Sequence, residues 1–296
     1  MQMSHHDFQS KNSFISELGV IVRELVEYRE LLYQITLRDI RIRYKQAVMG
    51  LGWAVLMPIL IILSGCIVRF AMAYLGGSNI KLMELAGITV KALPWAFFVG
   101  AVGFANTSLV NNANLVTKVY FPREVLPLSA VLAQGFDTAI GGGALSIVLP
   151  FLGAEFSLAL FWLPLLAIIL LSLTGAVGLF VSCANLFFRD VKYIVQVGLT
   201  FGIFFTPVFF EPQMFGPRGA ELMMLNPLAP ILEGIRLVIT ESHNLLQPLS
   251  LISEGGDSIR IWSPIYLLYS SVWAFGGFVA AAFFFHRMEF VFAEYA

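Results

Sequence analysis

The most distinctive chemical feature of the sequence is a cluster of cationic side chains directly before an apolar run. Residues 38–52 read RDIRIRYKQAVMGLG and contain Arg38, Arg41, Arg43, Tyr44 and Lys45. A guanidinium group binds two oxygens of a phosphate or carboxylate at once, and lysine adds a compact positive charge. The same charges also keep a chain segment on the cytoplasmic side of a membrane and attract anionic lipids. Anion recognition and membrane topology therefore both remain open as roles for this cluster.

Other ionisable residues stand alone in apolar surroundings. Asp137 is the only acid well inside an apolar run, and a carboxylate inside a membrane is a functional candidate, although one such acid can also brace helix packing. Glu233 and Arg236 lie three residues apart in another apolar stretch, a spacing that permits an ion pair on a helix. Asp137 has no evident catalytic partner, so we expect no enzyme activity in this chain.

Several common catalytic and cofactor motifs are missing from the sequence. It contains no GxxxxGK[ST] phosphate loop, no HExxH or GxSxG motif and no paired-cysteine metal spacing. We therefore expect that this chain binds neither ATP through such a loop nor a metal or other cofactor. A proton-driven transporter would also show further intramembrane acids and an internal repeat, which we do not find.

Composition identifies the class of protein. The chain has 296 residues, of which 58% are hydrophobic and only 12% are charged, and its mean hydropathy is +0.81. Soluble domains carry about 25% charged residues, and an apolar run of about 20 residues can cross a bilayer. The sequence predicts an all-α polytopic membrane protein with six spans: Ala47–Val68, Ala92–Val110, Val125–Gly153, Phe156–Phe188, Tyr193–Phe210 and Ile261–Phe285.

The distribution of positive charge predicts the orientation. If the N-terminus is cytoplasmic, twelve of the 18 lysines and arginines lie inside, in agreement with the positive-inside rule. Six spans then place both termini in the cytoplasm, and the protein in the cell inner membrane.

The segment before the first span divides into two parts. Residues 1–20 predict a polar tail, and residues 21–45 predict an amphipathic helix, because Ile21, Leu25, Tyr28 and Leu32 recur at helical spacing. Such a helix is too polar to span and is suited to the cytoplasmic membrane face. It is either a simple anchor or a functional platform.

Two connections within the transmembrane domain (46–296) also carry signals. In the cytoplasmic region 111–125, exposed apolar residues indicate a protein partner or the headgroup layer, and the residues alone slightly favour the membrane surface. In the external region 211–260, Leu228–Ile239 is apolar but too short to cross, and prolines break the chain around it. We predict a re-entrant helical hairpin there, with a folded external loop as the alternative.

Several stretches, taken in order, resemble one family. LLYQITLRDIRIRYKQAVMGLGWAVLMPIL is similar to the opening signature of permease subunits of type-2 ABC exporters that move lipid-linked polysaccharides such as O-antigen and teichoic acid. NNANLVTKVYFPREVLPL resembles the family's coupling region, and ANLFFRDVKYIVQVGL its turn between spans four and five. TPVFF followed by LNPLAPILEGIR resembles its external gate. The order and spacing of these stretches cover the chain from about Leu25 to the C-terminus.

The resemblance implies a half-transporter and its partners. Two copies would form a channel for the glycan, and two copies of a separate ATPase chain would dock from the cytoplasm and bind the ATP and Mg. Membrane lipids would surround the assembly, and no nucleic acid is expected. If the coupling region contacts the ATPase, the slight preference for the membrane surface there is overturned. The candidate coupling residues are Leu115, Val116, Lys118, Tyr120, Phe121 and Arg123.

The resemblance also suggests a role for the basic cluster. A lipid-linked glycan of the undecaprenyl diphosphate type presents its diphosphate at the depth of the inner headgroups. We hypothesise that Arg38, Arg41, Arg43, Tyr44 and Lys45 receive this diphosphate, and that Glu233 and Arg236 belong to the external gate. The alternative is a permease of the same architecture that exports a drug or another lipid.

Overall fold

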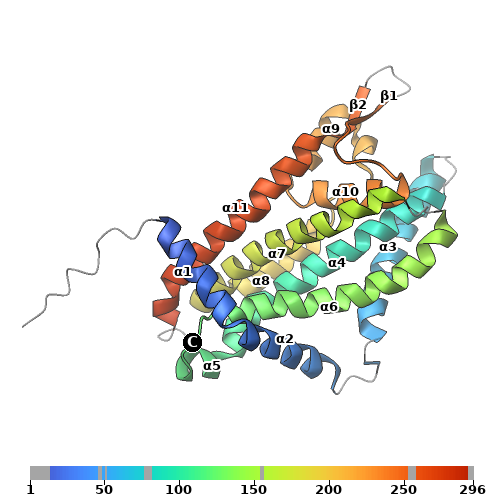
Figure 1. Cartoon of the computed structure of the whole chain (residues 1–296). Helices are drawn as coiled ribbons and strands as arrows, with labels where there is room; N and C mark the ends of the chain where they lie inside the picture. The colour runs from blue at the N-terminus through green and yellow to red at the C-terminus, as the bar shows by residue number, and fades with distance from the viewer. Residues whose placement is uncertain are drawn as a thin grey trace, which may run out of the picture.

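The computed structural model describes residues 14–45, 49–50, 52–76, 82–153, 157–252 and 258–292. Residues 1–13 of the predicted polar tail lie outside these ranges, as does the predicted start of the first span at Ala47. The described chain is a bundle of long tilted helices, with shorter helices at both ends and a small β-ribbon at one of them (Figure 1).

Five helices in the described residues are long and apolar enough to cross a membrane. They are α3 (Gly52–Gly76), α4 (Leu82–Asn111), α6 (Val125–Val148), α7 (Trp162–Phe187) and α11 (Pro264–Met288). Two 3-10 turns, η2 (Leu149–Leu152) and η3 (Leu158–Phe161), extend α6 and α7. The predicted class, a helical polytopic membrane protein, is confirmed.

The segment expected as the fifth span differs from the others. Its helix α8 (Val191–Gly202) has 12 residues, which is about 18 Å at 1.5 Å per residue and shorter than the roughly 30 Å hydrocarbon core. Turns follow over 203–208. Pro207 lacks a backbone N–H and disfavours the helical conformation of the residue before it, which explains why the helix does not continue to Phe210.

Three predicted span boundaries were wrong. The first helix continues through Arg69 to Gly76, and the second begins before Lys91. Both charges are neutralised inside the fold, since Arg69 pairs with Glu84 at 2.6 Å and Lys91 lies 3.8 Å from Glu233. A paired charge does not need water, so it does not force a helix to end. The last helix begins at Pro264 because the residues before it form a strand.

The core lies where α7 packs between α4 and α11, while α4 also packs against α6. The helix α3 contacts α4 and α6 and leaves most of its apolar surface uncovered in this single chain. Gly141 of α6 permits this approach, because a Cβ there would stand 2.9 Å from Leu93 of α4 and 3.3 Å from the Ala54 carbonyl of α3. Close helix contacts in membranes commonly use small residues in this way.

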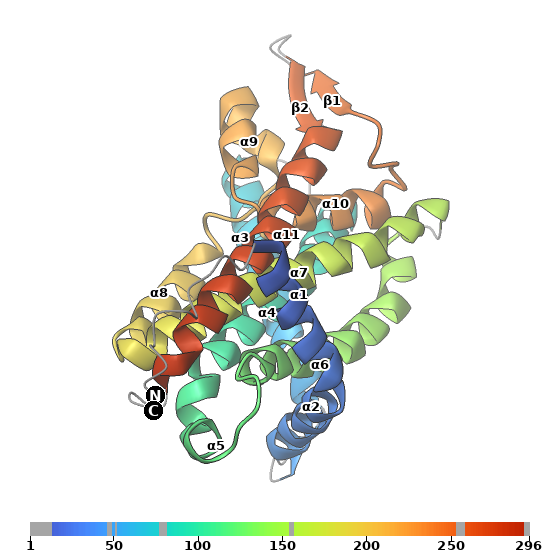
Figure 2. The same cartoon turned by 60° about the vertical axis from the view of Figure 1, so that its left-hand side comes forward.

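The predicted amphipathic helix is two helices, α1 (Phe14–Glu27) and α2 (Arg29–Tyr44). Its apolar face packs on protein. Ile35 is buried, and Leu25, Tyr28 and Leu32 pack against the same core cluster, which includes the ends of α4, α6, α7 and α11. The short helix α5 (Ala113–Lys118) and the turn η5 (Glu289–Val291) lie at this end of the bundle (Figures 1 and 2).

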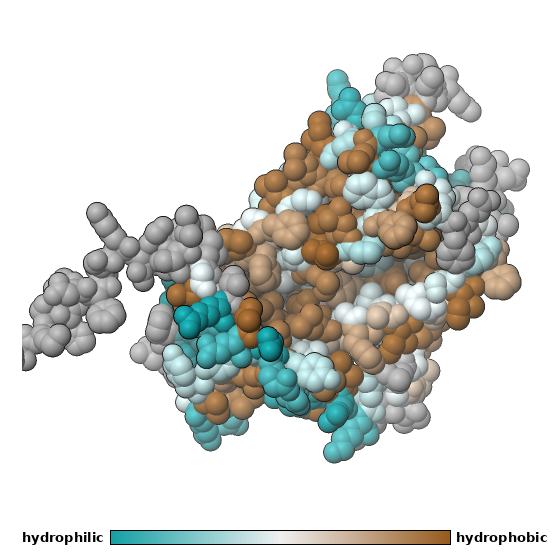
Figure 3. All heavy atoms as spheres, in the orientation of Figure 1, coloured by the Kyte–Doolittle hydropathy of each residue, from teal (hydrophilic) through white to brown (hydrophobic). Residues whose placement is uncertain are grey.

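The opposite end carries η4 (Pro212–Phe215), α9 (Gly216–Met224), α10 (Ala229–Thr240) and an antiparallel ribbon of β1 (Leu249–Ile252) and β2 (Ser258–Trp262). The ribbon departs from the all-α prediction. Trp262 anchors it, because its buried indole donates a 2.8 Å hydrogen bond to the Leu245 carbonyl. Polar residues gather at the two ends of the molecule, with a largely apolar band between them (Figure 3).

Candidate functional site

Two residues of the basic cluster reach an acid of the membrane domain. Arg43 Nη1 of α2 lies 2.7 Å from Asp137 Oδ2 of α6 and donates to Gln134 Oε1 at 2.9 Å. The Tyr44 hydroxyl donates to the other oxygen, Asp137 Oδ1. Burial and this contact with Asp137 raise the pKa of Tyr44 above its ordinary value, so the Tyr44 hydroxyl keeps its proton and acts as a hydrogen-bond donor here. We call these four residues the Arg43 site.

Aromatic rings and a cavity adjoin the Arg43 site. The Arg43 guanidinium lies over the Phe104 ring, 3.8 Å from its centroid, which is a cation–π distance. A cavity of about 490 Å³ opens beside it between α3, α4 and α6. Its aromatic lining comes from Trp53, Trp95, Phe97 and Phe104. The arrangement places one cation and several ring faces at one concave surface, as in sites that hold a polar ligand in apolar walls.

A glycine makes room for the polar contacts. A Cβ at Gly100 would stand only 2.8 Å from Gln134 Cδ, so any larger residue would push the amide that binds Arg43. Gly103, one turn along the same helix, has nothing within 4 Å of such an atom. The sequence did not identify Gln134, Phe104 or Gly100 as site residues. None of them belongs to a motif, and each gains its role only through packing.

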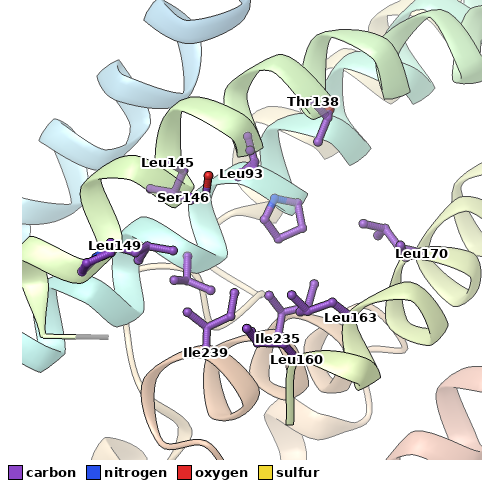
Figure 4. Close-up of a pocket in the computed structure, with 15 residues that line it drawn as sticks. Leu93, Thr138, Leu145, Ser146, Leu149, Leu160, Leu163, Leu170, Ile235 and Ile239 are labelled. Carbon is purple, nitrogen blue, oxygen red and sulfur yellow. The ribbon is translucent and has the colours of Figure 1, made fainter. Parts of the chain in front are cut away.

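An apolar cavity adjoins the first one. It measures about 350 Å³ and lies between α4, α6, α7 and α10, where Leu145, Leu163 and Ile239 face the same space (Figure 4). Both cavities are lined by Leu93 and Thr138. A cationic pocket and an apolar pocket are thus neighbours with Leu93 and Thr138 between them, an arrangement that suits a ligand with an anionic head and an apolar tail.

The other members of the basic cluster have different surroundings. Arg38 is held by Asp39 at 2.8 Å and by the Asn112 side-chain oxygen at 3.0 Å, and so ties α2 to the end of α4. Arg41 and Lys45 are exposed and form no ion pair within the part of the chain that the structure describes. These two charges remain available to a ligand at the surface.

The predicted coupling residues divide into buried and exposed groups. Val116 and Phe121 lie in the core, 0% and 5% exposed, and hold the loop on the bundle. Tyr120 is 93% exposed, and Lys118 and Val119 are exposed beside it, whereas Leu115 is half-buried. The earlier expectation that Val116 and Phe121 are exposed is wrong, since their apolar side chains close over the ends of α6 and α11.

Arg123 closes the same loop from within. Its guanidinium donates to the Val116 carbonyl at 3.1 Å and lies 3.4 Å from Glu289 Oε1 after α11. Glu289 also faces His286 and Glu124. Burial and the nearby Glu124 charge raise the pKa of Glu289 to about 7. Sequence reasoning missed Glu289 and His286 because they are distant from Arg123 in the chain. It missed Glu124, the next residue after Arg123, because Glu124 belongs to no recognisable pattern.

A second charged cluster lies near the opposite end. Arg236 Nη2 lies 2.6 Å from Glu233 Oε1, which confirms that these residues pair. Lys91 of α4 joins them, 3.8 Å from Glu233 Oε2, and donates to the Phe210 carbonyl at 2.8 Å. The exposed fractions of Lys91, Glu233 and Arg236 are 1%, 0% and 3%. The cluster fastens α10 and the chain after α8 to α4. A role of Glu233 and Arg236 as a gate stays a prediction.

Comparison with known proteins agrees with these features. The family of ABC-2 type transporters matches residues 30–240. A Klebsiella pneumoniae protein named O-antigen export system permease protein RfbA is 30% identical over 209 residues, which are 69% of this chain and 77% of that protein. A Myxococcus xanthus protein of the same name is 29% identical over 250 residues, 82% of this chain and 93% of its own length. The chain therefore belongs to the ABC-2 type transporter family and is the membrane-spanning permease subunit of such a transporter.

Proposed function

We propose that this chain is the transmembrane subunit of an ATP-driven exporter that moves a lipid-linked polysaccharide, of the undecaprenyl diphosphate type, across the inner membrane. The observation that carries the proposal is the pair of neighbouring cavities. One holds Arg43 among aromatic rings and the other is apolar. The relatives named as O-antigen export permeases support the same class of cargo.

The Arg43 site supplies a physical route for receiving the diphosphate. In the absence of cargo, the Asp137 carboxylate occupies the guanidinium of Arg43. A diphosphate carries more charge and more oxygens than a carboxylate, so it competes for the same bidentate donor. The exposed charges of Arg41 and Lys45 attract it to the surface first. The Trp53 and Trp95 ring faces then offer apolar contact to sugar rings and lipid.

The energy for transport would come from ATP hydrolysis by a separate ATPase docked on the cytoplasmic side. Tyr120, Val119 and Lys118 form an exposed apolar and cationic tip suited to a groove of a partner protein. Val116 and Phe121 anchor the tip to the bundle, so that movement of the partner is transmitted to α6 and α11. ATP and Mg would be bound by two copies of that partner, and both termini of this chain would lie in the cytoplasm.

A second copy of this chain would complete the channel. The exposed apolar surfaces of α3 and α8 support this assignment, including Leu63, Ile67, Ile194 and Val197. The two short helices α9 and α10, with the buried Glu233 and Arg236, would form the external gate as a re-entrant hairpin. Lipids would cover the remaining apolar band.

The decisive experiment replaces Arg41 and Arg43 with glutamine in the assembled transporter. We expect export of lipid-linked glycan to fail, while membrane insertion and binding of the ATPase subunit persist, because the substituted side chains are neutral but similar in size. Export is measured by surface glycan in cells that lack the parental gene.

Arg29→Gln is the matched control, since Arg29 is an exposed arginine at the start of the same helix. Export at the parental level in the double variant would contradict the proposed route. Stimulation of ATP hydrolysis by an apolar drug, but not by a polyprenyl diphosphate, would instead favour a different cargo.

A further inference from the structure

Three potential metal ligands converge at the end of the predicted coupling region (111–125, which we call the coupling loop), apart from the Arg43 site. Glu124 directly precedes α6, His286 lies in the last turn of α11, and Glu289 begins η5. One ligand atom of each lies within 4.8 Å of the others. His286 Nδ1 is 3.3 Å from Glu124 Oε1 and 3.8 Å from Glu289 Oε2. Residues more than 160 positions apart in the sequence thus present two carboxylates and one imidazole to a common point.

One oxygen of this cluster is not satisfied by its protein neighbours. Glu124 is 2% exposed, and its Oε2 atom is buried without a hydrogen-bond partner in the described structure. A buried carboxylate oxygen without a donor is costly, which calls for a counter-ion. The two oxygens of the Glu289 carboxylate have different partners. Its Oε1 accepts from the Arg123 backbone N–H at 3.1 Å and from the guanidinium at 3.4 Å, while its Oε2 faces His286.

The spacing and the donor types fit zinc. For bonds of about 2.0–2.1 Å, tetrahedral geometry separates neighbouring ligand atoms by about 3.4 Å, close to the shorter of the two observed distances. An imidazole with two carboxylates suits Zn²⁺ better than Mg²⁺ or Ca²⁺, which prefer six or more oxygen ligands. Arg123 matches the supporting groups that hydrogen-bond a ligating carboxylate and fix its orientation.

We propose that Glu124, His286 and Glu289 bind one Zn²⁺ ion, with water as the fourth ligand. The ion would neutralise the two carboxylates and clamp the end of α11 to the start of α6, next to Arg123 and the coupling loop. A ligand set of this kind would make the joint between the coupling loop and the membrane helices dependent on zinc. The inference does not depend on which lipid the transporter carries.

The test uses the full-length permease purified with its ATPase subunit through a tag without histidine. The parent for all measurements carries His5→Ala and His6→Ala, so that the N-terminal histidines add no zinc. After equilibration with micromolar Zn²⁺, we expect one zinc per chain by elemental analysis, a higher melting temperature than with a chelator, and tetrahedral absorption bands when Co²⁺ replaces zinc.

Glu124→Gln and His286→Asn should each weaken zinc affinity at least about tenfold, which is the loss commonly caused even by removing a supporting partner. His243→Ala is the matched control, because His243 is a half-buried histidine in the loop after α10, outside the proposed site, and its loss should leave zinc binding unchanged. If a variant does not fold, the zinc titration and the Co²⁺ spectrum of the parent still decide. Failure of the parent to bind zinc, or equal binding by the parent and folded ligand variants, would overturn the proposal.

Discussion

The Arg43 site and the cluster of Lys91, Glu233 and Arg236 are both ion pairs within an apolar helical bundle, but they differ in access. Arg43 and Asp137 keep 16% and 11% of their side chains exposed and border a cavity of about 490 Å³. In the other cluster, Lys91 and Glu233 are almost completely buried, and a backbone carbonyl accepts a hydrogen bond from the lysine.

From this difference we propose that the Arg43 site can exchange its ion partner, whereas the cluster of Lys91, Glu233 and Arg236 stabilises the fold. Because Arg43 and Asp137 line the cavity, we propose that an anion there can replace Asp137 as the partner of Arg43. Lys91, Glu233 and Arg236 are at most 3% exposed, so removal of Glu233 would leave two buried cations without the carboxylate they share. We therefore expect a charge inside this protein to bind ligand where a cavity reaches it, and to stabilise the fold where it is fully buried.

The largest effect is expected from Glu233→Ala. This substitution leaves Lys91 and Arg236 buried without their shared carboxylate, and breaking a buried ion pair costs roughly 3–5 kcal/mol of unfolding free energy. Thermal unfolding of the purified transporter and the amount of protein in membranes measure the loss. Glu241→Ala is the control, since Glu241 contacts the same Arg236 but is much more exposed, and we expect at most about 1 kcal/mol. Equal losses of unfolding free energy in the two variants would show that burial does not decide how strongly these ion pairs stabilise the fold.

A smaller effect is expected at the Arg43 site, where a substitution should strengthen ligand binding rather than weaken the fold. Asp137→Asn keeps an acceptor for Tyr44 but removes the negative charge that competes for Arg43. If the pair contributes about 1 kcal/mol, a polyprenyl diphosphate should bind roughly fivefold more tightly. Titration of the purified transporter in detergent measures this. Weaker binding would mean that Asp137 supports the anion rather than standing in for it.

A third variant tests whether Gln134 matters for the geometry of Arg43. Gly100→Ala adds a methyl group about where the Gln134 amide lies, and should displace its hydrogen bond to Arg43. The expected loss is about 1 kcal/mol, or roughly fivefold in affinity for the diphosphate. Gly103→Ala, on the same helix with open space around it, should bind the diphosphate like the parent. Equal affinities in both variants would show that Gln134 is not needed.

The smallest effect is expected at a third ion pair. Arg69 and Glu84 meet at 2.6 Å, but their side chains are 15% and 23% exposed. Glu84→Gln should lower the unfolding free energy by under about 1 kcal/mol, because a partly exposed pair is weakened by solvent whatever its distance. A loss as large as that of Glu233→Ala would show that distance, rather than burial, decides the strength of these pairs.

Parts of the candidate site were visible in the sequence. The basic cluster, Asp137 and the pair of Glu233 and Arg236 were each conspicuous because a charge in an apolar stretch is rare. Their partners were not predicted. Arg43 meets Asp137 across 94 positions, and Lys91 approaches Glu233 from another helix, so no local spacing revealed either contact. The same limitation placed Val116 and Phe121 on the surface, because an apolar residue in a loop carries no sign of what covers it.

The sequence by itself determined that this is a membrane protein. It also determined the approximate positions of the long helices and the family to which the chain belongs. These properties depend on the length and order of apolar runs, which are local. Only the tertiary structure decided which charges are paired, where the helices end and which surfaces stay open. Those outcomes depend on groups that are distant in the chain meeting in a medium with little water, where an ion is stable only beside its partner.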